Sequence, residues 1–257
     1  MSELFAFGRA AGNGGDYGLS GDMKKTQYVL QLLGSPAQAE TLKCLITAVE
    51  MGMETDVGVL DMSAGEHEND DYLAVSPFGI VPTLKEADYY LSGSTGIMSY
   101  IEARGLGKRL PPKNAALLAE QNYWSDVACT EVGPHVDTLV RERIMAPMGD
   151  RDTQAATAAR EALRAPLDAL DARLAGGGEF IIGNYSFADI HWTAYVHLLY
   201  EAREGDLIDQ RPNVKAWFDR IRSHRSYSGQ DIVAYDLLPR AADIRGGQLK
   251  SVSIDDF

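Results

Sequence analysis

The sequence predicts an α/β domain built on a small sheet, followed by an all-helical domain. Three observations support this prediction. Between residues 27 and 104, short apolar runs typical of strands alternate with segments of helical periodicity. Residues 105–113 are rich in glycine and proline, which is typical of a linker. Beyond this stretch, long segments rich in alanine and leucine favour helix almost throughout.

Composition and charge restrict the function. The chain has 257 residues and a net charge of −13, from 37 acidic and 24 basic residues. This charge argues against binding to nucleic acid or to anionic membrane surfaces. The N-terminus lacks the features of a secretory signal, and no apolar run reaches membrane-spanning length. The two cysteines, Cys44 and Cys129, favour a reducing compartment. We therefore expect a cytoplasmic protein.

These signals divide the chain into five segments. We expect an N-terminal arm over 1–22, an α/β domain over 23–104, a linker over 105–113, a helical domain over 114–225 and a tail over 226–257. The arm is rich in glycine, but it follows no strand and lacks the Lys-Ser/Thr pair of a phosphate loop. It is therefore not expected to bind a nucleotide.

The first half begins with a strand, a helix and a second strand. The nearly continuous apolar run from Gln27 to Leu33 suits a central strand, and Thr55 to Leu60 predicts the next. Between them, Ser35 is the expected N-cap of a helix, and Gln38 three residues later completes a capping box. A right-handed β-α-β crossover makes the two strands parallel.

The stretch 72–102 completes this domain. A proline and a glycine mark a turn over 76–79, and Pro82 marks the start of a strand. A hairpin strand follows, and then a helix for which Ser94 is the expected N-cap. The free amides at such a helix start can hold a carboxylate. The order of elements predicts a thioredoxin-like unit.

The second half carries its own helix signals. A long helix is expected over 115–145, bent or broken at Pro134, and another over 153–174. Ser186 and Asp189 stand at the N-cap and N3 positions of a capping box that starts a buried helix.

Two of these segments resemble the glutathione S-transferase family. Residues 76–84 read Ser-Pro-Phe-Gly-Ile-Val-Pro-Thr-Leu, and residues 93–101 read Gly-Ser-Thr-Gly-Ile-Met-Ser-Tyr-Ile. Together they are similar to the glutathione-binding motif of that family, and residues 180–190 are similar to its second hallmark. The resemblance covers about residues 25–225. One departure is that Gly93 stands where the family has an acidic residue.

The resemblance implies an enzyme of detoxification with glutathione as co-substrate. The glutathione thiolate attacks an electrophilic carbon of a small hydrophobic molecule, by conjugation or dehalogenation. The resemblance also implies a homodimer. A non-catalytic binding or regulatory module on the same fold is the alternative from another class, and a peroxidase is a lesser enzymatic alternative.

The resemblance also implies which residue activates the thiol. In serine-type members, a hydroxyl at the start of the first helix hydrogen-bonds the glutathione sulfur, and Ser35 matches this position. Gln38 is its rival, and Tyr28 and Tyr17 are weaker candidates. No cysteine stands at this helix start, which disfavours the thioltransferase branch. Cys44 is interpreted as a small buried apolar residue.

Four further residues are implied to bind glutathione. Pro82 matches the family's cis-proline, and Val81 matches the residue whose backbone pairs with the cysteinyl part of glutathione. Ser94 matches the residue that holds the γ-glutamyl carboxylate. Gly93 either leaves the glutathione amine without its usual acid or is present for its backbone freedom. No metal site is expected, because the acidic loop around His67 lacks ligand spacing.

Overall fold

The computed structural model describes residues 29–35, 37–87 and 89–228. The predicted arm over 1–22 and the candidate tyrosines Tyr17 and Tyr28 lie outside these residues, as does the predicted tail from residue 229 onward.

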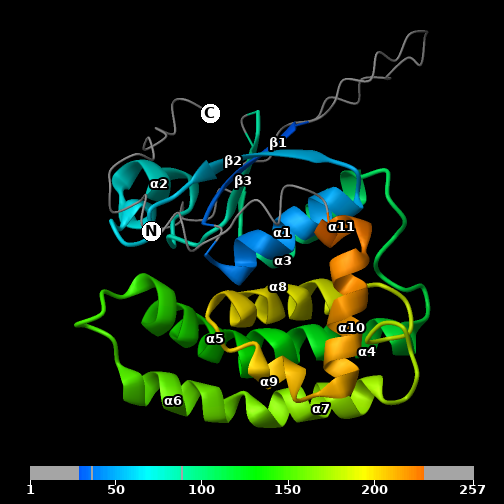
Figure 1. The fold of residues 1–257 in the computed structure, drawn as a ribbon. Helices are drawn as coiled ribbons and strands as arrows, with labels where there is room; N and C mark the ends of the chain where they lie inside the picture. Colours follow the sequence, from blue (N-terminus) through cyan, green and yellow to red (C-terminus); the bar gives the residue numbers. More distant parts are fainter. Residues whose placement is uncertain (1–28, 36, 88, 229–257) are drawn as a thin grey trace, which may run out of the picture.

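A four-stranded sheet forms the first half, with strand order β2-β1-β3-β4. Its strands are β1 (Val29–Gly34), β2 (Glu54–Val59), β3 (Thr83–Glu86) and β4 (Tyr89–Ser92). The pair β1 and β2 is parallel, which confirms the expected crossover, and β3 is antiparallel to both β1 and β4. This mixed sheet confirms the predicted fold of the first half (Figure 1).

Among its described residues, this half has three α-helices: α1 (Ala39–Glu50), α2 (Asp70–Val75) and α3 (Ser94–Arg104). A 3-10 turn, η1 (Glu66–Glu68), precedes α2. The sequence did not predict α2. Figure 1 shows α1 and α3 between the sheet and the helical half. Because α1 is enclosed in this way, nearly every residue of it is buried.

Among the described residues, the regular elements of the second half are all helices, joined by loops. Its elements are, in order, α4 (Ala115–Val127), η2 (Ala128–Val132), α5 (Gly133–Val140), η3 (Arg141–Met145), α6 (Thr153–Ala162), α7 (Arg164–Leu174), α8 (Phe187–Glu201), α9 (Asp206–Asp209), α10 (Pro212–Ser223) and α11 (Arg225–Ser228). The central helix is α8, which is buried from Ala188 to Leu199. Within the described part of the chain, no helix is both long and apolar enough to cross a membrane.

Pro134 does not break the long helix over 115–145. Instead, the turn before it widens into the π-helical segment η2, and α5 begins at Gly133. Proline has no N–H to donate, so a local change of helical pitch accommodates it. Gly133 is needed for packing as well, because a Cβ there would lie 2.7 Å from the Tyr195 hydroxyl oxygen.

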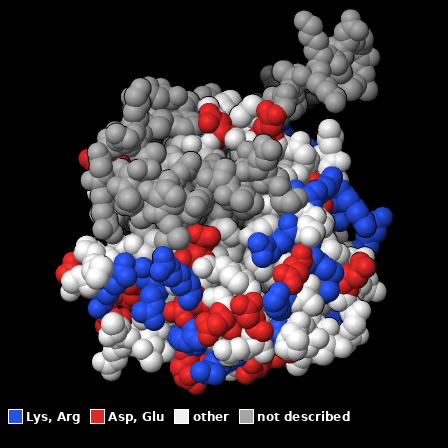
Figure 2. All heavy atoms as spheres, viewed as in Figure 1, with Lys and Arg blue, Asp and Glu red and all other residues white. Residues whose placement is uncertain are grey.

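The two halves also meet at the end of α1. The Arg225 Nη2 donates hydrogen bonds to Glu50 Oε1 at 3.0 Å and to the Glu50 carbonyl at 2.8 Å. Figure 1 shows α11 beside α1. Over the helical half, Figure 2 shows basic and acidic side chains interspersed in that view, so the acidic excess forms no single-signed surface there.

Two predicted helix caps are wrong. The N-cap of α1 is Gln38, whose side chain makes no capping hydrogen bond, and Ser35 lies three residues earlier. The Gln38 N–H donates to the Ser35 carbonyl at 3.0 Å, so residues 35–38 form a turn instead of the first helical residues. The N-cap of α3 is Gly93, and Ser94 is already helical.

The capping box at α8 is confirmed. Four donors surround the fully buried Asp189 carboxylate: the N–H groups of Ile181 and Ser186, the Ser186 hydroxyl and the Trp217 indole, at 2.9–3.1 Å. Burial raises the pKa of Asp189 to about 6, although these donors act to lower it. The carboxylate therefore joins the start of α8 to α10 and to the preceding loop.

Replacing Asp189 by Ala is expected to lower the free energy of unfolding by about 3–5 kcal/mol, because buried donors lose their acceptor. Chemical denaturation measures this loss. Asp152→Ala is the matched control, since Asp152 is an exposed aspartate N-cap that accepts from Gln154 and Ala155 at 2.9 Å. Its loss is expected to be about 1 kcal/mol. Equal losses for the two variants would contradict the structural role of Asp189.

Candidate functional site

The residues predicted for the site converge around the start of α1. Gly34 ends β1, and a Cβ on it would lie 3.2 Å from Pro82 Cβ and 2.7 Å from Thr41 Oγ1. Only glycine permits this close approach of strand, helix and proline loop. The Gly93 N–H donates to the Pro82 carbonyl at 3.0 Å, which ties the start of α3 to the same loop.

Ser35 and Gln38 share a cavity of about 670 Å³. The turn that carries them is fixed, because the Ser35 N–H donates to Thr41 Oγ1 at 3.1 Å. The opposite wall comes from the helical half, where Pro134, Asp137 and other residues of α5 and η3 line the cavity. Val81, Pro82, Gly93 and Ser94 are not among its lining residues. The structure therefore brings the two candidates for thiol activation to one space facing the helices.

Gln38 has an unsatisfied polar atom at this cavity. Its Oε1 is buried and has no hydrogen-bond partner among the described residues. A buried amide oxygen without a donor is unfavourable, and a bound donor group would satisfy it. The position at the N-cap also places the Gln38 side chain beside the positive end of the α1 dipole.

The Val81–Pro82 peptide bond is cis, which confirms that feature of the expected motif. Hydrogen bonds hold the loop before it: the Tyr72 hydroxyl donates to the Ile80 carbonyl at 2.8 Å, and the Ser76 hydroxyl donates to it at 3.0 Å. Pro82 stands directly before β3 and lies next to Gly34, so the backbone of Val81, one residue earlier, lies near the same end of the sheet.

Ser94 has a partner that the sequence did not reveal. Its hydroxyl donates a hydrogen bond to Glu40 in the first turn of α1. Gly93, just before it, has φ +94°, a conformation that side chains rarely adopt. The open question about Gly93 is thus answered in part: its backbone conformation requires glycine.

Glu40 is the centre of a hydrogen-bond network between the two halves. Its Oε1 accepts from Lys43 Nζ at 2.5 Å and from the Tyr195 hydroxyl of α8 at 3.0 Å. Burial acts to raise the pKa of Glu40, but the charge of Lys43 and the hydrogen bonds from Lys43, Ser94 and Tyr195 outweigh it and lower the pKa. Glu40 is therefore an ionised carboxylate directly beside Ser94.

The roles of Glu40 and Lys43 were not predicted from the sequence. A signal was present, because two charged residues three apart interrupt an otherwise apolar helix. The pattern did not show that Lys43 is fully buried, since its partner Tyr195 lies 152 residues away. Among the described residues, no group of three or more His, Cys, Asp or Glu is placed to hold a metal ion.

Comparisons with known proteins agree with this geometry. The profile described as "Glutathione S-transferase, N-terminal domain" matches residues 40–104. The profile described as "Glutathione S-transferase, C-terminal domain" matches residues 131–224. Both halves of the chain are thus matched by domains of one family.

Individual relatives match over nearly their full length. Glutathione S-transferase F10 of Arabidopsis thaliana is 31% identical over 199 residues, covering 75% of this chain and 92% of the relative. Glutathione S-transferase 3 of Zea mays is 28% identical, covering 82% and 96%. The crystal structure of glutathione transferase F7 from Populus trichocarpa superposes with a TM-score of 0.72 at 29% identity, covering 80% of this chain and 99% of that one.

Gly93→Ala is expected to destabilise the protein by about 1–3 kcal/mol, because alanine at φ +94° is strained. Gly96→Ala, three residues on, is the matched control. A Cβ there would make an ordinary 3.5 Å contact with Leu91, so alanine in this helix should stabilise by about 0.5–1 kcal/mol. Thermal unfolding compares the two variants. A neutral Gly93→Ala would show that the backbone at Gly93 can change conformation at little cost.

Proposed function

Because this chain belongs to the glutathione S-transferase family, we propose that it transfers glutathione to an electrophilic carbon of small hydrophobic molecules. The observation that carries the proposal is the cavity shared by Ser35, Gln38 and the helical half. One wall offers polar groups at a helix start, and the other includes apolar residues such as Val140 and Met145. A thiol and an apolar electrophile can meet in such a space.

We infer that a side chain of the turn 35–38 stabilises the glutathione thiolate, as in a serine-type enzyme. The thiolate is the nucleophile, and both the α1 dipole and a hydrogen-bond donor favour it. Ser35 remains the first candidate because it bears a hydroxyl at the cavity wall, and Gln38 is its rival because it stands at the N-cap. Cys44 does not suit a cysteine-type role, because it is fully buried within α1 and burial raises the pKa of its thiol.

The remaining parts of glutathione have matching groups nearby. In this proposal the backbone of Val81 binds the cysteinyl part of glutathione. Ser94 and the start of α3 bind the γ-glutamyl carboxylate. Glu40 then replaces the acid missing at Gly93, since its ionised carboxylate lies beside Ser94 and its side chain is 38% exposed. This carboxylate can bind the ammonium group of glutathione.

A non-catalytic binding module is the second candidate. The observation that favours it is the hydrogen bond from the Ser94 hydroxyl to Glu40, which occupies the donor that a ligand carboxylate would use. We also propose, from the composition of the chain, that the protein is located in the cytoplasm.

The protein is also proposed to form a homodimer. The support is a set of large apolar side chains exposed close to the site, with Phe78 85%, Ile80 45% and Tyr89 45% exposed. Exposed apolar groups of this size are typical of surfaces that associate.

Millimolar glutathione is expected to raise the melting temperature, because a ligand that binds only the folded state stabilises it. Turnover of a chloronitrobenzene with glutathione is expected as well. A thermal shift without turnover would support the binding module. The absence of both the shift and the turnover would contradict both functions.

The same assay identifies the activating side chain. Ser35→Ala is expected to lower kcat about ten- to a hundredfold with little change in glutathione affinity, as for a lost charge-assisted hydrogen bond. Gln38→Ala tests the rival. Ser63→Ala is the control, since Ser63 lines the same cavity but donates to Asp61. Unchanged kcat in both Ser35→Ala and Gln38→Ala would remove the turn from the mechanism.

Phe78→Asp is expected to weaken the dimer, because it places a charge on the apolar surface proposed to associate. Light scattering after size-exclusion chromatography measures the mass of the assembly. Leu106→Asp is the matched control, as Leu106 is 98% exposed on the segment between α3 and α4. A wild-type mass equal to one 28.0 kDa chain would refute the homodimer itself.

A further inference from the structure

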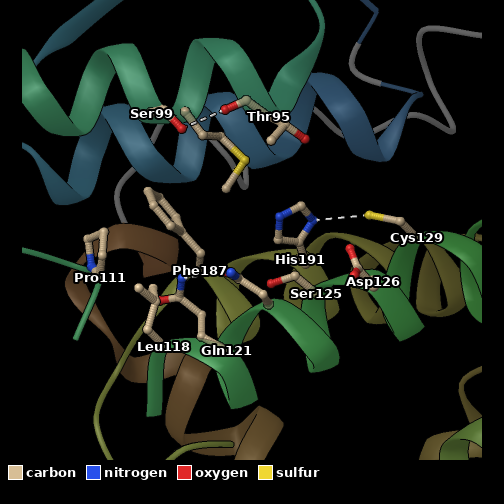
Figure 3. Close-up of a pocket in the computed structure, with 12 residues that line it drawn as sticks. Thr95, Ser99, Pro111, Leu118, Gln121, Ser125, Asp126, Cys129, Phe187 and His191 are labelled. Atoms are coloured by element: carbon tan, nitrogen blue, oxygen red, sulfur yellow. Dashed lines mark hydrogen bonds between the residues drawn. The ribbon is translucent and has the colours of Figure 1, made fainter. Parts of the chain in front are cut away.

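A second cavity, of about 450 Å³, lies between α3, α4 and α8. Its walls combine apolar side chains such as Met98 and Phe187 with uncharged polar ones such as Ser125. Cys129 and His191 also line it, and none of its lining residues belongs to the 670 Å³ cavity at the start of α1. Figure 3 shows Cys129 and His191 at one side of this space.

Cys129 has two nitrogen neighbours. Its Sγ lies 3.4 Å from His191 Nδ1 and 3.5 Å from Lys43 Nζ. Burial, followed by the charge of Lys43, lowers the pKa of His191 to about 3, so the imidazole is neutral. Both nitrogen atoms can donate a hydrogen bond to the sulfur when it carries negative charge.

The cation beside the sulfur is held rigidly. Lys43 is fully buried, and an ammonium group has three N–H donors. Their three partners are Glu40 Oε1 at 2.5 Å, the Tyr195 hydroxyl at 2.9 Å and Cys129 Sγ at 3.5 Å. Burial, and next the charge of Glu40, raise the pKa of Tyr195, so that its hydroxyl keeps its proton. Cys129 Sγ is thus the third partner of the Lys43 ammonium group, beside Glu40 and Tyr195.

An independent feature of the cavity points to a ligand. Gln121 is only 3% exposed, and its Oε1 has no hydrogen-bond partner among the described residues. Figure 3 shows its side chain rising from α4 toward the space between Pro111 and Phe187. A ligand with a donor group would satisfy this oxygen.

We propose that Cys129 is a nucleophilic thiol that captures small uncharged Michael acceptors entering the cavity between α3, α4 and α8. The sulfur bonds to the β-carbon of the acceptor, and the electron pair of the C=C bond moves to the α-carbon. The thiol proton leaves to water, and water protonates the α-carbon, so no oxidant or reductant is needed. This cavity is separate from the one at the start of α1, and the proposal does not rest on the transferase function, but the two sites share the Lys43–Glu40 pair.

The residues that line this cavity favour uncharged electrophiles. The carboxylate of Asp126 stands at the wall, and Lys43 is already paired with Glu40, so an anionic electrophile finds no free cation among the lining residues. Cys44 cannot compete, because it is fully buried and burial raises the pKa of its thiol. The chain holds no other cysteine.

The test treats the full-length protein with N-methylmaleimide at about pH 7 and follows adduct formation by intact-mass and peptide mass spectrometry. A single adduct at Cys129 is expected, and it should form at least about tenfold faster than the adduct of N-acetylcysteine, since a thiol beside the Lys43 cation is more reactive. A maleimide bearing a carboxylate should show a smaller acceleration over its own reaction with N-acetylcysteine. No acceleration, or comparable labelling of Cys44, would overturn the proposal.

Variants separate the entry of the reagent through the cavity from the contribution of His191. Ser125→Phe, which fills the cavity, should slow labelling at least about fivefold, because the reagent then loses access to the thiol. His191→Gln should slow it as well. His197→Gln should not, although His197 is also buried on α8, because it bonds the Tyr227 hydroxyl at 2.8 Å. An unchanged rate in Ser125→Phe would overturn entry through the cavity, even if His191→Gln failed to fold.

Discussion

The fold depends on the pairing of one buried cation. Lys43 has no exposed surface, and an ammonium group left unpaired in such a place would cost several kcal/mol. Its partners come from both halves of the molecule: Glu40 from α1 itself, Tyr195 from α8 and Cys129 from η2. The pairing is satisfied only when α1 lies against α8 in one register. Gly133 makes this register possible, because any side chain there would collide with Tyr195.

This constraint also places the candidate site. With α1 fixed against the helices, its N-terminal turn opens toward α5 and forms the cavity that contains Ser35 and Gln38. Glu40 connects the buried pair to Ser94, so one carboxylate belongs both to the joint between the halves and to the proposed glutathione site. Binding at the start of α3 and packing of α1 on α8 are therefore coupled through a single side chain. Cys129, on the other side of Lys43, belongs to the same network.

Sequence analysis predicted the features whose causes lie within a few residues. The capping box of Ser186 and Asp189 is present, and so is the parallel pair β1 and β2 that the crossover rule predicts. The cis bond at Pro82, which the resemblance to the glutathione S-transferase family implied, is present as well. It failed at the starts of α1 and α3, where Ser35 and Ser94 have typical capping chemistry. At these places a turn over residues 35–38 and the positive φ of Gly93 set the helix start, and the serine hydroxyl at α3 bonds to Glu40 on another helix.

By itself, the sequence determined the order of the strands, most of the helices and the proline loop, because these follow from local backbone preferences and short spacings. Only the tertiary structure decided which charged groups are buried and what they bind. Glu40 and Lys43 are ordinary helix residues in the sequence, and their role comes from Tyr195, about 150 residues away. The same holds for Cys129 and His191, 62 residues apart. Contacts of this kind depend on how α1, η2 and α8 pack, which no local pattern specifies.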